Sequence, residues 1–91
     1  MKHMELYISG KVQGVCFRSL TQSLAKELGL TGYVENLEDG RVHIEAEGTD
    51  KDLKELLDWT HRGPDLAEVE KVEIKWSDDF VDYTDFTLLE P

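Results

Sequence analysis

The sequence predicts a two-layer α+β sandwich, in which two helices cover one face of a mostly antiparallel β-sheet. Three observations predict this class. Five short stretches alternate apolar and polar residues, which is typical of strands with one buried face. Two longer stretches repeat apolar residues every three or four positions, as amphipathic helices do. These patterns follow in the order strand, helix, strand, strand, helix, strand, with one short strand at the end.

Length and charge limit the classes of function that the chain can serve. Its 91 residues predict a single domain over residues 1–91. The net charge of −10 disfavours binding to nucleic acids and anionic membranes, because both depend on lysine and arginine neutralising phosphates. No apolar run is long enough to span a bilayer, and a single cysteine allows no internal disulfide. We therefore expect a cytoplasmic monomer.

The first strand and the first helix flank a glycine-containing loop. Apolar residues alternate over residues 4–10, which predicts a strand. A helical repeat follows over residues 18–28 and ends at Gly29. The predicted inner face of this helix carries Phe17, Leu20, Leu24 and Leu28.

The second and third strands form a predicted hairpin. Residues 31–37 and 41–47 have strand-like composition, and the Asp-Gly pair at residues 39–40 favours a tight turn between them. The third strand alternates strictly, so one of its faces is expected to be buried and the other solvated. The expected buried residues are Val42, Ile44 and Ala46, and the expected solvated ones are Arg41, His43, Glu45 and Glu47.

A second helix and two further strands complete the chain. Thr49 is the expected N-cap, and Gly63 with Pro64 ends the helix. Residues 68–76 predict a fourth strand, with a bulge near Val69 where the alternation changes phase. Residues 83–89 predict a short extra strand. The βαββαβ order predicts a ferredoxin-like sandwich whose first and third strands are central neighbours.

The loop over residues 10–18, with the sequence Gly-Lys-Val-Gln-Gly-Val-Cys-Phe-Arg, is a candidate anion site. Its glycines allow the backbone to approach a ligand closely. The following helix begins with N–H groups that have no intrahelical acceptor, which favours a bound anion. Arg18 adds a permanently charged donor suited to phosphate.

Two motifs resemble those of the acylphosphatase family. Residues 10–18 resemble its first signature, Gly-x-Val-Gln-Gly-Val-x-aromatic-Arg. Residues 32–48 are similar to its second signature: a glycine and an aromatic residue, then Asn36 after two residues, Gly40 after three more, Val42, and a later glycine. Both motifs fall on the expected elements, and the resemblance covers almost the whole chain.

The resemblance implies hydrolysis of acyl phosphates, without metal or other cofactor and without a phosphoenzyme. Arg18 would bind the phosphate oxygens, and Asn36 would position the attacking water. The backbone N–H groups of six residues would form a cradle for the phosphate: Gln13, Gly14, Val15, Cys16, Phe17 and Arg18. The acyl phosphate would be a small-molecule substrate.

Other interpretations stay open. Cys16 is a possible nucleophile, although its spacing from Arg18 differs from the Cys-x5-Arg of cysteine phosphatases, so we expect a packed loop residue. His3, His43 and His61 have no metal-ligand spacing and are expected at the surface. The chain could also be a non-catalytic anion sensor, or could act on a substrate handed over by a larger enzyme.

Overall fold

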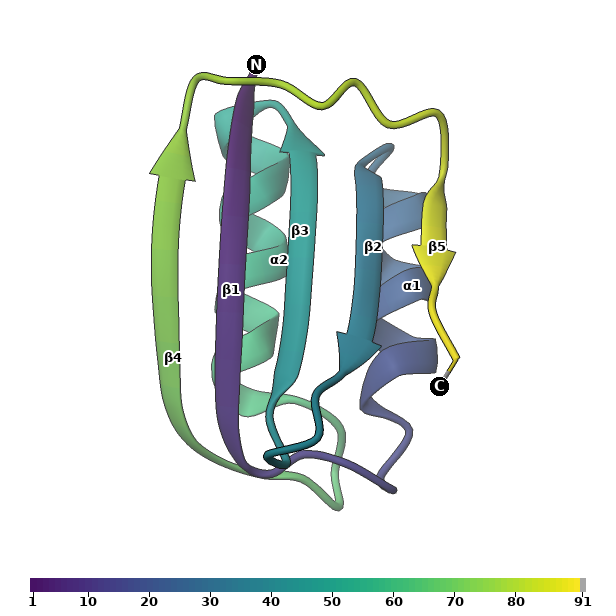
Figure 1. Ribbon diagram of the computed structural model, residues 1–91, viewed down its shortest axis with the longest axis vertical. Helices are drawn as coiled ribbons and strands as arrows, with labels where there is room; N and C mark the ends of the chain where they lie inside the picture. The colour runs from purple at the N-terminus through teal and green to yellow at the C-terminus, as the bar shows by residue number, and fades with distance from the viewer. Residues whose placement is uncertain (91) are drawn as a thin grey trace.

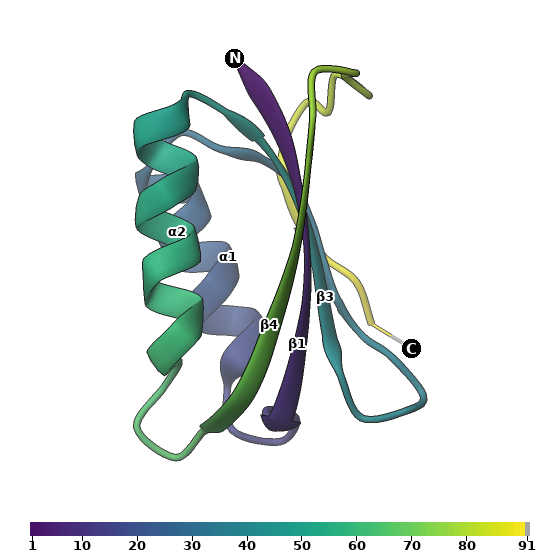
Figure 2. The same ribbon diagram turned by 90° about the vertical axis from the view of Figure 1, so that its left-hand side faces the viewer.

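The protein, described by a computed structural model over residues 1–90, consists of one five-stranded sheet and two helices packed on one of its faces (Figures 1 and 2). The elements are β1 Lys2–Lys11, α1 Phe17–Glu27, β2 Thr31–Asn36, β3 Val42–Gly48, α2 Asp50–Arg62, β4 Glu68–Ser77 and β5 Phe86–Leu88. The predicted element order is confirmed, although β5 is shorter than the predicted strand over residues 83–89.

The strands lie in the order β4-β1-β3-β2-β5. β1 and β3 are central neighbours, as the ferredoxin-like prediction requires, and every pair among β1 to β4 is antiparallel. β5 adds to the edge of β2 in parallel, which makes the sheet mixed. The chain therefore returns to the end of the sheet at which β2 stops, beside the start of α1 (Figure 1).

The predicted bulge near Val69 is confirmed in the pairing of β1 with β4. Ser9 pairs with Lys71 but Gly10 pairs with Val69, so the register shifts by one residue. Gly10 has φ 125°, and a Cβ there would overlap the carbonyl oxygen of Glu68. Only glycine fits this position, which lies in β1 one residue before the strand ends.

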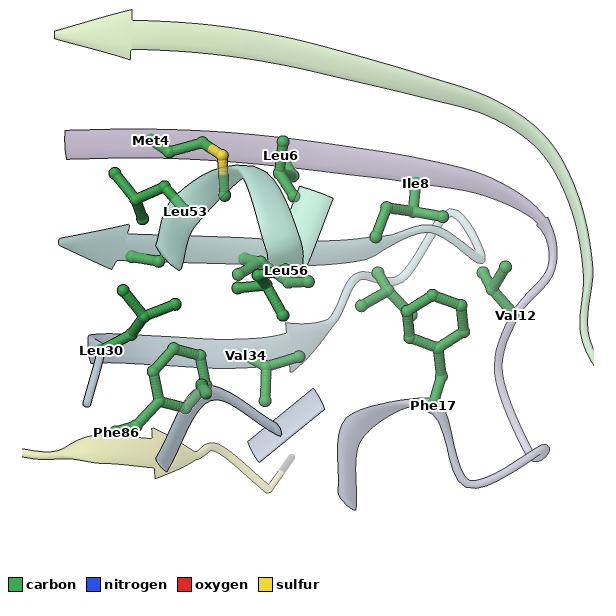
Figure 3. Packing of buried hydrophobic residues seen from close by; sticks show 14 of the residues in the cluster. Met4, Leu6, Ile8, Val12, Phe17, Leu30, Val34, Leu53, Leu56 and Phe86 are labelled. Atoms are coloured by element: carbon green, nitrogen blue, oxygen red, sulfur yellow. The ribbon is translucent and has the colours of Figure 1, made fainter. Parts of the chain in front are cut away.

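The core lies between the helices and the sheet, where Met4, Leu6 and Ile8 of β1 face Leu53 and Leu56 of α2 (Figure 3). Thr49 caps α2 as predicted, because its hydroxyl accepts a hydrogen bond from the N–H of Asp52. The prediction for α1 is partly wrong. Leu20 is 45% exposed, and the fully inner positions belong to Phe17, Thr21 and Ala25. Their spacing of four places one large and two small side chains against the sheet.

The prediction that the other face of the sheet is solvated is wrong. His43 is 6% exposed, His3 8% and Glu47 4%. These side chains belong to a layer of paired polar groups, which we call the histidine–glutamate cluster. It consists of His3 and Glu5 on β1, Glu35 on β2, and His43, Glu45 and Glu47 on β3. Of the three histidines expected at the surface, only His61 is exposed.

The segment between β4 and β5 runs past the end of the sheet at which β1 begins (Figure 1), and it contacts this cluster there. The backbone N–H groups of Val81 and Asp82 donate to the Glu47 carboxylate at 2.7 and 3.0 Å. The Tyr83 ring stacks on His3 with 6.3 Å between the ring centroids. Pairing among long polar side chains, together with this segment, replaces the second helical layer that this face lacks.

Candidate active site

A cavity of about 190 Å3 lies where the loop between β1 and α1 meets the ends of β2 and β5. Its lining comes from the loop, the first turn of α1, the last residue of β2 and the C-terminal segment. The lining residues are Val12, Gly14, Cys16, Phe17, Arg18, Ser19, Asn36, Leu88 and Glu90. Residues far apart in the chain therefore meet at one end of the sheet.

The loop backbone presents unpaired N–H groups. Gly14 has φ 75° and Cys16, the N-cap of α1, has φ 66°, and no side chain caps the helix. Among residues 1–90, no group accepts a hydrogen bond from the backbone N–H groups of residues 13–18. Alternation of right- and left-handed backbone produces such anion-binding concavities, and the helix N-terminus adds partial positive charge. The loop therefore has the donors that an anion needs.

Buried side chains and one amide hold the loop in place. Val12, Val15 and Phe17 are almost fully buried, and the Phe17 ring lies 5.2 Å from that of Trp59. The Gln13 side chain donates to the carbonyl oxygens of Leu37 and Arg41, at 2.8 and 3.0 Å. The loop is thus braced against the turn between β2 and β3.

Arg18 lies in the first turn of α1, which contains no acidic residue. Its Nη1 donates to the carbonyl oxygen of Leu89 at 2.9 Å. A guanidinium group has five N–H donors, so this bond orients the group and leaves others for a ligand. Glu90 also lines the cavity, and its side chain is the only carboxylate that residues 1–90 contribute to the lining.

Asn36 is the last residue of β2, and its side chain points to the helix side of the sheet, as does that of the buried Val34 two residues earlier. Its Oδ1 is buried and has no hydrogen-bond partner within the described part of the chain. A buried acceptor without a partner costs free energy, and such an atom calls for an explanation such as a water or a ligand. Its place in the cavity lining supplies one.

The structure brings together five of the predicted site residues: Gly14, Cys16, Phe17, Arg18 and Asn36 all line the cavity. Two others are turned away. Val15 is buried, and the Gln13 side chain binds the neighbouring turn, so only their backbones are available to a ligand.

Sequence analysis missed Leu88, Leu89 and Glu90 as parts of this site. The predicted last strand was the one available signal, but its pairing with β2 cannot be read from its own residues.

The cavity offers poor ligands for a metal ion. Its lining contains no histidine and, in residues 1–90, one carboxylate and one exposed thiol, those of Glu90 and Cys16. The prediction that Cys16 is a packed loop residue is wrong, because its side chain is exposed. No side-chain hydrogen bond joins its thiol to a base among these residues. The arrangement suits binding of an anion by N–H donors.

The chain matches known proteins in both sequence and fold. The acylphosphatase family model matches residues 4–88. The acylphosphatase of Methanococcoides burtonii is 51% identical over 82 residues, which are 87% of this chain and 85% of that protein. That of Marinobacter nauticus is 51% identical over 81 residues, 89% of this chain and 88% of that protein. The acylphosphatase structure from Bacillus subtilis superimposes with a TM-score of 0.96 at 30% identity, covering 99% of this chain and all of that one. This chain therefore belongs to the acylphosphatase family.

Proposed function

We propose that this acylphosphatase binds the phosphoryl group of an acyl phosphate in the cavity beside α1. The backbone N–H groups of residues 13–18 and the guanidinium of Arg18 bind its oxygens, and Asn36 holds the attacking water. One observation carries this proposal. The same cavity and its loop contain unpaired backbone N–H donors, the guanidinium of Arg18, and the buried Oδ1 of Asn36, which has no partner among the described residues.

The reaction needs positioning and charge stabilisation more than acid catalysis. Water attacks phosphorus, the bond from phosphorus to the carboxyl oxygen breaks, and the leaving group departs as a carboxylate of low pKa. The proton of the water passes to a phosphate oxygen, so the products are a carboxylate and dihydrogen phosphate. Arg18 and the N–H groups stabilise negative charge on the equatorial oxygens. Oδ1 of Asn36 accepts a hydrogen bond from the water and aims its lone pair at phosphorus.

The surroundings determine which substrates and partners fit. The net charge of −10 repels a phosphate dianion at long range, so binding depends on the local donors of the cavity. The same charge disfavours nucleic acids. No helix in residues 1–90 is long and apolar enough to cross a membrane. A single domain that acts as a cytoplasmic monomer on a small acyl phosphate is the simplest form of this proposal.

The test is release of phosphate from benzoyl phosphate in the presence of EDTA. We expect the wild type to turn over and Arg18→Ala to lose at least about 10³-fold in kcat/KM, as with other arginines that stabilise phosphoryl transfer. Cys16→Ser is the matched control in the same loop and should retain activity.

Three results would contradict the proposal. A folded wild type that binds phosphate without turnover would favour the anion-sensor alternative. Complete loss of activity in Cys16→Ser would favour a cysteine nucleophile. Hydrolysis that requires a metal ion would contradict a site built from N–H donors.

A further inference from the structure

The histidine–glutamate cluster lies on the sheet face away from the helices, and neither the cavity nor its chemistry uses it. Glu35 and Asn36 are consecutive residues of β2, but they point to opposite faces of the sheet. The cluster places four carboxylates around two imidazoles. Such a concentration of partly buried negative charge is costly unless cations compensate it.

His43 is held between carboxylates at both of its ring nitrogens. Nδ1 lies 2.7 Å from Oε2 of Glu35, while Nε2 lies 2.9 Å from Oε2 of Glu5 and 3.7 Å from Oε2 of Glu45. The Tyr7 ring stacks on the imidazole with 4.6 Å between centroids. Packing and hydrogen bonding therefore fix the plane of the ring and the direction of Nε2.

The tautomer of His43 determines which atom faces the oxygens of Glu5 and Glu45. A neutral imidazole carries one N–H, and donation of Nδ1–H to Glu35 leaves a lone pair on Nε2. That lone pair then faces the oxygens of Glu5 and Glu45. Three electron-pair donors converge on one region, so a cation must lie between them. Either a proton on Nε2 or a metal ion meets this need.

We propose that this region binds a divalent transition-metal ion of the Zn2+ class, with His43 Nε2, Glu5 and Glu45 as ligands. The three ligand atoms all lie within 4.8 Å of one another. Zinc bonds of about 2.0–2.2 Å place tetrahedral ligands about 3.5 Å apart, so small side-chain rotations complete the site, with water as the fourth ligand. The nitrogen ligand favours zinc over calcium and magnesium, which prefer oxygen alone.

Neighbouring groups orient the two carboxylates. The Tyr33 hydroxyl donates to Oε2 of Glu45 at 2.8 Å, and the Tyr7 hydroxyl donates to Oε2 of Glu5 at 3.2 Å. Ionised carboxylates are the form that a metal ion binds.

The remaining groups around His43 complete a recognisable metal-site pattern. A metal-bound histidine usually donates its other N–H to a carboxylate, which sets its tautomer, and Glu35 occupies that position here. His3 bonds the second oxygen of Glu45 at 2.7 Å. Other side chains that carry positive charge near this region are His3 when it is protonated, Lys75 near Glu5, and Arg41, whose guanidinium lies over Tyr7.

The experiment titrates ZnCl2 into EDTA-dialysed wild-type protein near neutral pH, followed by calorimetry and by imidazole 15N spectra. We expect one saturable site per chain and a large shift of Nε2 of His43, while the exposed His61 does not respond. His43→Gln should abolish the binding, and the matched control His61→Gln should keep it. Glu35→Gln should weaken binding by about 10–100-fold, because it removes only the partner that orients His43.

The proposal is overturned if no saturable binding occurs, if the shift appears at His61 instead of His43, or if His43→Gln binds as the wild type does. The spectra use the wild type alone, so they decide the question even if a variant fails to fold.

Discussion

At the scale of single residues, two groups that line the cavity also destabilise the folded state. Oδ1 of Asn36 is buried without a partner, and Cys16 adopts a left-handed backbone conformation that side chains other than glycine seldom adopt. Both features oppose folding, and both lie in the cavity lining. Unfavourable local features that gather at one place are typical of a functional site, because selection for stability alone would remove them.

Asn36→Ala separates these two effects. We expect kcat to fall by about 10²-fold, as on loss of one positioned polar group, with little change in KM because Arg18 still binds the phosphate. The free energy of unfolding should stay the same or rise by up to about 1–3 kcal/mol, since a buried acceptor without a partner is removed. Steady-state kinetics and urea unfolding measure both. Glu38→Ala, exposed in the next turn, is the control, and an unchanged kcat in Asn36→Ala would refute the role of Asn36.

At the scale of elements, the site is held by contacts between segments that are not neighbours in the chain. Gln13 ties the loop before α1 to the turn between β2 and β3. The residues after β5 supply the carbonyl group that orients Arg18. The cavity therefore depends on the relative position of a loop, a hairpin and an edge strand, each positioned by the common core.

Substitution of Gln13 tests the brace between loop and hairpin. Gln13→Ala removes two hydrogen bonds, so we expect a loss of about 1–3 kcal/mol in the free energy of unfolding and a higher KM from a looser cradle. Gln13→Glu keeps the shape but directs a carboxylate at two carbonyl oxygens, and it should be more damaging than alanine. Urea unfolding and kinetics on both variants provide the check. Equal stability of the wild type and both variants would show that the two hydrogen bonds of the Gln13 side chain do not stabilise the fold.

At the scale of the whole molecule, the two faces of the sheet are stabilised by different physics. One face is an apolar core beneath the helices, and the other is the histidine–glutamate cluster. The apolar core responds weakly to pH, whereas the cluster depends on the charges of its members. The pH dependence of folding therefore reports on the cluster.

Stability should be highest in mildly acidic to neutral solution. Burial opposes charge on His3, but its bonds to Glu47 and Glu45 outweigh that and raise its pKa, so its contribution is complete below about pH 6.5 and disappears as the pH rises through the folded-state value. Burial likewise opposes charge on Glu47, but His3 and the N–H groups of Val81 and Asp82 lower its pKa. That contribution is present above about pH 4.5 and disappears as the pH falls through the folded-state value.

Thermal unfolding with EDTA, followed across this range, measures the effect. His3→Gln should be less stable than the wild type below about pH 6.5. Its stability should also lack the decrease that the wild type shows as the pH rises above that value. A wild-type profile that stays flat above that pH, or one that His3→Gln leaves unchanged, would contradict the contribution of His3. His61→Gln serves as the control for an exposed histidine.

Much of this protein follows from the sequence by itself. Strand alternation and helical periodicity predicted the element order, and the central position of β1 and β3 followed from the βαββαβ order. The phase change near Val69 predicted the bulge. Two motifs located Arg18 and Asn36, which the fold then placed in one cavity. These features depend on residues close together in the chain, so a single sequence displays them.

The tertiary structure alone decided the rest. The bond between Arg18 and Leu89 joins residues 71 positions apart, and the bond between His3 and Glu47 joins residues 44 apart. Alternation showed that His43 lies opposite the core, but it could not show that carboxylates from neighbouring strands bury it. Pairing of distant polar groups depends on strand order and register, which no local pattern of hydrophobicity encodes.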